Sequence, residues 1–98
     1  MNFEVILVDD VEDELRKVAE LIEEQREGFG FIFLDELDQV LNVLCEYPRS
    51  HGKVFADCRA IKIGRFSYVL IYEVIQHTVV IYKLIHTSMH PDRRTIAE

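Results

Sequence analysis

The sequence lacks any apolar run long enough to cross a membrane. Its longest runs, Tyr68–Tyr72 and Thr78–Tyr82, contain five residues each, whereas a membrane-spanning helix needs about 20 apolar residues. The first residues carry an early Glu4 and no basic stretch, which is unlike a secretory signal peptide. These absences predict a cytoplasmic protein that has no membrane partner.

Basic residues are also scarce. The chain has 11 Lys and Arg against 18 Asp and Glu, for a net charge of −7. A nucleic-acid backbone repels an acidic protein, so the net charge disfavours nucleic-acid binding as the main function. The charge is uneven, because residues 1–49 carry −10 and residues 50–98 carry +3. The weakly basic second half can therefore still contact phosphate or an acidic partner.

Cysteine is rare and isolated. Cys45 and Cys58 form no C-x-x-C pair, so we expect two small, partly buried apolar side chains rather than a disulfide. His86 and His90 are four residues apart, but the segment before them is predicted as a strand and no further ligand is close in sequence. The sequence thus predicts no metal site, no cofactor and no small-molecule substrate.

What remains is the composition of one soluble domain. The 98 residues are 49% hydrophobic and 30% charged, which suits a single globular domain over residues 1–98. No repeat, linker or low-complexity stretch divides it.

Hydrophobic periodicity predicts the first three elements. Phe3–Leu7 is rich in β-branched residues and indicates a strand. Asp9 and Asp10 are placed as N-caps, rather than as a catalytic carboxylate pair, of a helix that ends near Glu27. A second helix, whose apolar positions run from Phe33 to Leu44 and whose limit is Pro48, follows after a short connection. Two such helices form an antiparallel hairpin.

The second half predicts strands. Residues 47–57 are rich in turn-forming residues and are expected to be the one long loop. Arg59–Ile63, Tyr68–Val74 and Thr78–His86 follow as strands with short connections, which require antiparallel neighbours. The predicted fold is α+β, with the order βααβββ: a two-helix hairpin on one face of a small, mainly antiparallel, four-stranded sheet.

Both faces of that sheet are predicted to be apolar. Strict alternation places Val79, Ile81, Lys83 and Ile85 on one face of the last strand, and Val80, Tyr82, Leu84 and His86 on the other. Two helices cover one face only. We expect the second face to bind a partner chain, a second copy of this chain in a homodimer, or the C-terminal tail. The alternative is a domain that leaves a few apolar residues exposed.

Two segments resemble a known family. Residues 33–48 are similar to its second helix, which ends in an aromatic residue or His followed by Pro. Residues 59–74, with G-R-F-S-Y at 64–68, and then Thr78–His86, resemble its strand pattern. The family is the RelE/ParE superfamily of bacterial toxin–antitoxin (plasmid stabilisation) pairs, in its ParE-like branch, and the resemblance covers residues 2–90. It implies a small cytoplasmic toxin that a cognate antitoxin holds inactive.

The two branches of the superfamily act differently: RelE-like members cut messenger RNA on the ribosome, and ParE-like members poison DNA gyrase. RNA cleavage needs basic groups that stabilise the transition state and a group that moves a proton. At the positions where the resemblance to RelE-like sequences implies basic groups, this chain has Ala60, Lys62, Val69, Ser88 and Met89. Of these residues, only Lys62 is basic. The sequence thus favours a protein that is not an enzyme. The ribonuclease alternative would use Lys62, Arg65 and His86.

The resemblance also weakens at the C-terminal end. ParE-like sequences close with His-Gly-Arg-Arg-Asp, whereas here the arginines arrive several residues after His86. An inactive, toxin-derived interaction domain is therefore a further alternative. The predicted partner-binding residues are Arg59, Lys62, Arg65, Tyr72, His86, Arg93 and Arg94.

Several of these predictions have structural alternatives. Arg65 is equally expected to hold the sheet against the acidic helices. Arg59 and Lys62 are compatible with charges on an edge strand, which discourage aggregation. Tyr68, Tyr72 and Tyr82 are expected to serve packing rather than base stacking.

Overall fold

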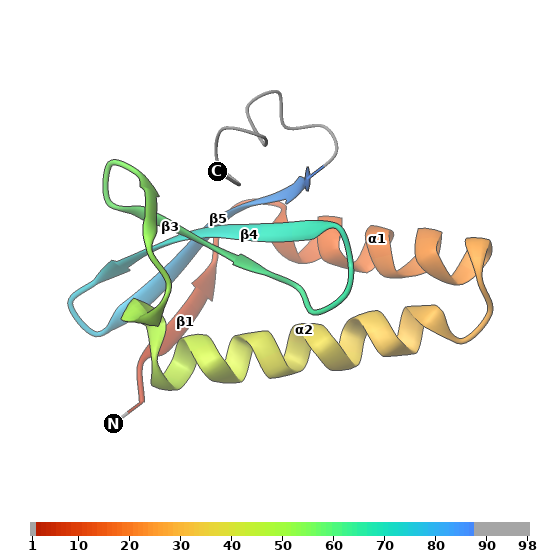
Figure 1. Cartoon of the computed structure of the whole chain (residues 1–98), viewed down its shortest axis with the longest axis horizontal. Helices are drawn as coiled ribbons and strands as arrows, with labels where there is room; N and C mark the ends of the chain where they lie inside the picture. Colours follow the sequence, from red (N-terminus) through yellow and green to blue (C-terminus); the bar gives the residue numbers. More distant parts are fainter. Residues whose placement is uncertain (1, 88–98) are drawn as a thin grey trace.

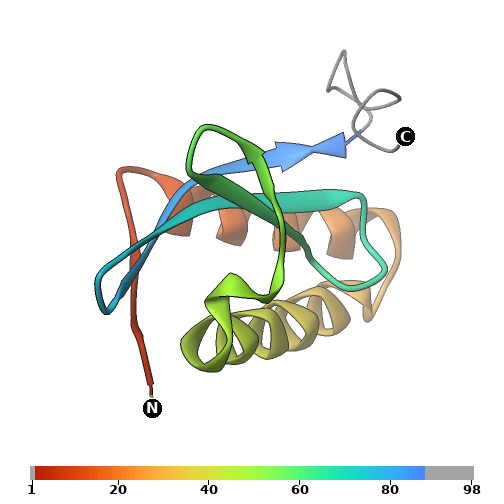
Figure 2. The same cartoon turned by 60° about the vertical axis from the view of Figure 1, so that its left-hand side comes forward.

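The structure is a computed structural model, and it describes residues 2–87. Two helices lie side by side on one face of a five-stranded sheet (Figure 1). The helices are α1 (Val11–Gln25) and α2 (Phe29–Glu46), and the strands are β1 (Glu4–Leu7), β2 (Lys53–Phe55), β3 (Cys58–Lys62), β4 (Tyr68–Ile75) and β5 (Thr78–His86). Figure 2 shows both helices on the same side of the sheet. The predicted α+β class and helical hairpin are confirmed.

The strand order is β1-β5-β4-β3-β2. β1 runs parallel to β5, from which the two helices and three other strands separate it in the chain, and the other neighbours are antiparallel. The fifth strand, β2, lies within residues 47–57. The prediction that this segment is only a loop was therefore wrong: a short 3₁₀ helix (Pro48–Ser50) and β2 occupy it. β2 escaped notice because it has three residues and an irregular register with β3.

A carboxylate and two glycines set the hairpin between the helices. Glu23 accepts hydrogen bonds from the backbone N–H groups of Gly28 and Gly30, each at 2.9 Å, so it neutralises the positive end of α2. A Cβ at Gly30 would lie 2.9 Å from the carbonyl oxygen of Ala19. Only glycine lets the helices approach this closely.

The start of α1 differs in detail from the prediction. Asp10 occupies the N-cap position, but its side chain makes no capping hydrogen bond. Asp9 lies in a left-handed turn with φ of 51°. Both residues therefore mark the helix start, as expected, while the acidic first turn complements the helix dipole.

The core lies between the helices and the sheet. α2 contributes Phe33 and Leu44, which are fully buried, and β4 contributes Leu70 and Tyr72. The Tyr72 hydroxyl donates a 2.7 Å hydrogen bond to the carbonyl of Pro48. Burial raises the pKa of Tyr72, and the Arg59 guanidinium opposes this. The whole buried set is Val11, Leu15, Ala19, Phe33, Leu37, Val40, Leu44, Ile61, Ile63, Leu70, Tyr72, Val79 and Ile81.

A bulge in β5 changes which residues share a face. Tyr72 pairs with Ile81 but Ile71 pairs with Lys83, so Tyr82 is the extra residue. Val79 and Ile81 face the helices, and beyond the bulge Leu84 takes that side and packs against the core. The strict alternation predicted for this strand was wrong beyond Ile81, because it assumed an unbroken pleat.

Candidate functional site

The G-R-F motif fixes the β3–β4 turn on α2. Gly64 has φ of 52°, and a Cβ there would overlap the Glu36 carboxylate. Arg65 donates its backbone N–H to Glu36 Oε1 at 2.9 Å and its Nε–H to Oε2 at 3.0 Å. Phe66 packs edge-on against Phe33, with 5.2 Å between ring centroids. These contacts support the structural alternative for Arg65.

The Glu36 carboxyl responds to this contact. Its pKa is lowered, chiefly by the hydrogen bond from the Arg65 backbone N–H; desolvation opposes this, and the Arg65 guanidinium lowers the pKa further. Sequence reasoning missed Glu36, because it is one of several acids on α2 and nothing in the pattern distinguishes it. In the sequence, only the glycine at position 64 could have indicated that another element approaches this turn closely.

The three residues of the ribonuclease alternative lie on different sides of the sheet. His86 pairs with Tyr68 on the helix side, where their rings pack edge-on at 4.7 Å. Lys62 pairs with Val69 on the opposite side. Arg65 bends toward α2 and Glu36. The structure does not bring the three together around one reacting atom.

The sheet face away from the helices is apolar, as predicted, and we call it the outer face. Ile6 is 41% exposed on β1, and Val69 and Ile71 on β4 are half-buried. Cross-strand pairing and the bulge assign the following residues to it: Ile6, Cys58, Ala60, Lys62, Val69, Ile71, Glu73, Val80, Tyr82, Lys83 and Ile85. Ala60 and Val69 lie on this face, and they are two of the positions at which the resemblance to RelE-like sequences implies a basic group.

One polar pair lies on the outer face. The Tyr82 hydroxyl donates a 2.8 Å hydrogen bond to Glu73 Oε1, and this bond raises the pKa of Tyr82. Burial, followed by the charges of Glu73 and Asp57, raises the pKa of the neighbouring Cys58 thiol. Cys58 therefore stays protonated near neutral pH and is a poor nucleophile.

A second apolar surface is the inter-helix groove, a hollow of about 870 Å³ along α1 and α2. Phe31 is 77% exposed at its side, next to Leu34. Four glutamates and one arginine line the groove together with the apolar residues. Its lining comprises Leu7, Glu12, Leu15, Arg16, Ala19, Glu20, Glu23, Glu24, Gly30, Phe31, Leu34, Leu37 and Leu41. Sequence reasoning missed it, because a groove depends on how two helices are spaced.

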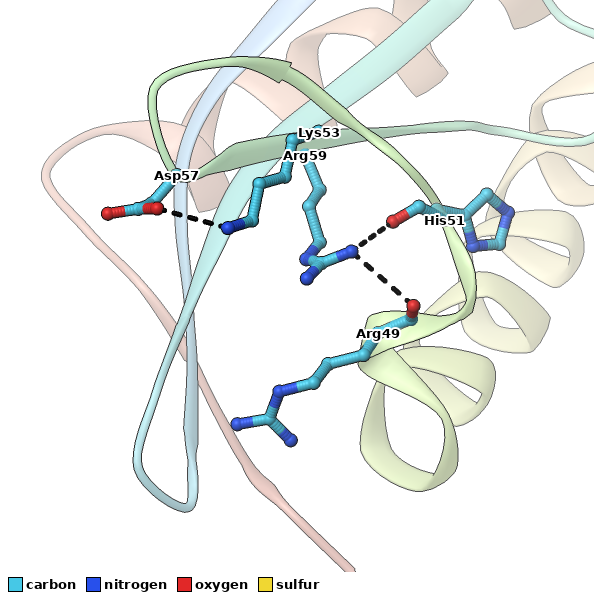
Figure 3. Close-up of polar contacts among 5 residues, drawn as sticks. All are labelled: Arg49, His51, Lys53, Asp57 and Arg59. Atoms are coloured by element: carbon cyan, nitrogen blue, oxygen red, sulfur yellow. Dashed lines mark hydrogen bonds and ion pairs between the residues drawn. The ribbon is translucent and has the colours of Figure 1, made fainter.

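A third surface is the cationic corner, formed by Arg49, Lys53 and Arg59 beside His51 and Asp57 (Figure 3). Arg59 lies on β3, which β2 covers. The prediction of Arg59 as an edge-strand charge was therefore wrong, because the edge strand is β2. The Arg59 guanidinium instead donates to the backbone carbonyls of Arg49 and His51.

The remaining predicted partner residues include Tyr72, Arg93 and Arg94. Tyr72 is fully buried, so its side chain offers no surface to a partner. Arg93 and Arg94 lie outside the described residues, as do Ser88, Met89 and His90.

Metal-binding clusters and membrane-spanning helices are both absent from residues 2–87. This part of the chain contains no group of three or more His, Cys, Asp or Glu arranged to hold a metal ion. Neither of its helices is both long and apolar enough to span a bilayer.

Comparison with known proteins gives the chain a family. The family described as the ParE toxin of the type II toxin–antitoxin system parDE matches residues 5–91. The chain belongs to the ParE toxin family. The predicted membership of the RelE/ParE superfamily, in its ParE-like branch, is thereby confirmed. No curated protein matches the sequence.

Solved structures support the same fold for this ParE-family chain. A chain of the chromosomal ParDE toxin–antitoxin system from P. aeruginosa superposes with a TM-score of 0.73 at 8% identity, covering 86% of this chain and 95% of that one. A chain of the intact E. coli RelBE toxin–antitoxin complex gives 0.55 at 23% identity, covering 84% and 93%. At these identities the likeness establishes the fold alone.

Proposed function

We propose that this ParE-family chain is a toxin of a type II toxin–antitoxin system that acts in the cytoplasm by binding a protein target, with DNA gyrase as the named candidate, and that a cognate antitoxin neutralises it. The observation that carries the proposal is the apolar outer face. Half-buried Ala60 and Val69 stand on this face where the resemblance to RelE-like sequences implies basic groups. Such a face suits protein contact.

The inter-helix groove supports an antitoxin partner. Its apolar floor and exposed Phe31 match the requirements for an amphipathic helix laid along α1 and α2. Its acidic lining adds a charge requirement, because Glu12, Glu20 and Glu24 favour basic residues at the margins of that helix. The partner proposed for the groove is therefore an antitoxin helix that has one apolar face and basic flanks.

Induced expression in a bacterial host tests the proposal. We expect growth arrest, altered plasmid supercoiling and intact messenger RNA in the same culture. Arrest with cut messages would support the ribonuclease alternative instead. Unaffected growth, with soluble protein confirmed, would leave an inactive interaction domain.

The groove has its own test. Phe31→Asp places a charge on its apolar side, and we expect antitoxin binding to weaken by about 2–4 kcal/mol, as for a central interface residue. Leu21→Asp is the matched control, since Leu21 is another exposed apolar residue of the hairpin but does not line the groove. Titration calorimetry with the proposed cognate antitoxin measures both losses. Equal losses would contradict the groove assignment.

A further inference from the structure

The cationic corner carries an inference that does not depend on toxicity or on the inter-helix groove. Lys53 of β2 and Arg59 of β3 are directly paired across the two strands. Figure 3 shows both side chains leaving the same side of the strand pair. Like charges directly opposite each other destabilise a sheet. The pairing of Lys53 with Arg59 therefore does not stabilise the fold.

Among the described residues, Asp57 is the one carboxylate in the corner that offsets these charges. Lys53 forms a 3.2 Å ion pair with Asp57, but both side chains are more than half exposed, so this pair contributes little. Within residues 2–87, neither Arg49 nor Arg59 forms an ion pair with a carboxylate. Two guanidinium groups thus remain without an acidic partner in the described part of an otherwise acidic chain.

Contacts with other parts of the chain hold both guanidinium groups in place. The backbone carbonyls of Arg49 and His51 hold Arg59, and the Arg49 guanidinium lies 5.4 Å from the centroid of the Phe3 ring. A guanidinium held in this way loses less entropy on binding, and its remaining N–H groups match a carboxylate in a bidentate geometry. The corner is therefore arranged to receive carboxylates.

The neighbouring strand indicates the shape of the ligand. β2 is the last strand of the sheet, so within the described residues its outward edge pairs with no other strand. Phe55 is 64% exposed and Val54 is also exposed. An exposed edge of this kind accepts an extended peptide by backbone hydrogen bonds.

We propose that the cationic corner and the open edge of β2 bind a short, extended, acidic segment of a protein partner, whose carboxylates pair with Arg49, Lys53 and Arg59. A peptide fits better than a nucleic acid. A long polyanion would extend toward the helical half of the molecule, where residues 1–49 carry −10 and would repel it. A short acidic segment occupies only the corner.

Fluorescence anisotropy with the purified chain tests this proposal. The probe is a labelled peptide of about eight residues in which Asp alternates with Thr, because alternate residues share one face of a strand. A peptide with Asn in place of Asp is the neutral probe, and single-stranded oligothymidylate of equal charge is the nucleic-acid probe. We expect the acidic peptide to bind at least about tenfold tighter than the neutral peptide, since charged hydrogen bonds are the stronger ones. We expect it also to bind more tightly than the oligonucleotide, because the acidic residues 1–49 repel a nucleic-acid backbone.

Variants locate the binding. The double substitution Arg49→Gln with Lys53→Gln should weaken acidic-peptide binding about tenfold, which corresponds to about 1.4 kcal/mol. Lys17→Gln with Arg26→Gln makes the same charge change on the helical hairpin, outside the inter-helix groove, and should leave binding within about twofold, because surface charges beyond a Debye length are screened. Backbone amide shifts in the folded protein should centre on residues 53–55.

Three results would overturn the proposal. The acidic and neutral peptides would bind equally, or the two double variants would lose equal affinity, or the oligonucleotide would bind more tightly than the acidic peptide. Because the assay uses purified chain, these results are independent of whether expression arrests growth.

Discussion

The helical and the strand-rich parts of the molecule use charge in opposite ways. Residues 9–46 hold thirteen acidic against three basic side chains, whereas residues 47–87 hold six basic against two acidic ones. Most acids of the helices are exposed. Two are not: Glu23 holds the start of α2, and Glu36 holds the β3–β4 turn. The acidic side chains thus face solvent across most of the hairpin, and they hold the fold together at two positions.

The contact between Glu36 and Arg65 joins the two parts, and Gly64 makes it possible. We expect Gly64→Val to destabilise the fold by about 3 kcal/mol or more, because a side chain there strains a left-handed backbone and displaces Glu36. Gly52→Val is the control: no atom lies within 4 Å of its Cβ position and its φ is not left-handed. Urea unfolding compares the two. Equal destabilisation would contradict the account of the G-R-F turn.

Glu23 provides the next largest effect. Glu23→Ala removes the acceptor of two backbone N–H groups at the start of α2, so we expect a loss of about 2 kcal/mol in the free energy of unfolding. Glu24→Ala, at an exposed neighbour, should change stability by about 0.5 kcal/mol or less. Thermal unfolding measures both. A similar loss in the two variants would mean that the carboxylate of Glu23 does not fix the hairpin.

Two tyrosines offer a smaller contrast between the buried side of the sheet and its outer face. Tyr72→Phe leaves the Pro48 carbonyl without its donor in the core and should cost about 1–2 kcal/mol. Tyr82→Phe removes a more exposed bond to Glu73 and should cost about 0.5 kcal/mol. Chemical denaturation of both variants decides the order. A larger loss for Tyr82 would reverse our assignment of the two faces.

The smallest effect is a pH dependence at Glu36. The pKa of Glu36 is lower in the folded chain than its usual 4.5, so the carboxylate stabilises the fold above that value, and the stabilisation is lost as pH falls through the lowered folded pKa. The difference in stability between the wild type and Glu36→Gln should therefore shrink as pH falls below about 4.5. Unfolding curves at a series of pH values measure it. A difference that stays constant with pH would show that the charge of Glu36 is irrelevant.

The sequence predicted the periodic features well. The apolar spacing of Val11, Leu15 and Ala19 located α1, and the bounds of β5 were correct to the residue. β2 and the bulge at Tyr82 were missed, because neither a three-residue strand nor one extra residue leaves a periodic signal.

The surfaces were harder to predict than the elements. An apolar outer face followed from alternation, but the inter-helix groove and the cationic corner depend on which elements become neighbours. Tyr72 and Arg65 were predicted from a sequence pattern to bind a partner. In the structure, Tyr72 makes a buried hydrogen bond and Arg65 contacts Glu36 on α2. A pattern identifies chemistry, whereas packing decides whether a partner can reach it.

The central claim is that this chain acts through contact with a protein and not by cutting RNA. The most direct measurement incubates the purified chain with DNA gyrase and relaxed plasmid, and in parallel with ribosomes translating a defined message. We expect inhibition of supercoiling by the wild type, relief of that inhibition by Ile71→Lys on the outer face, and intact message. Message cleavage with unaffected supercoiling would contradict the account.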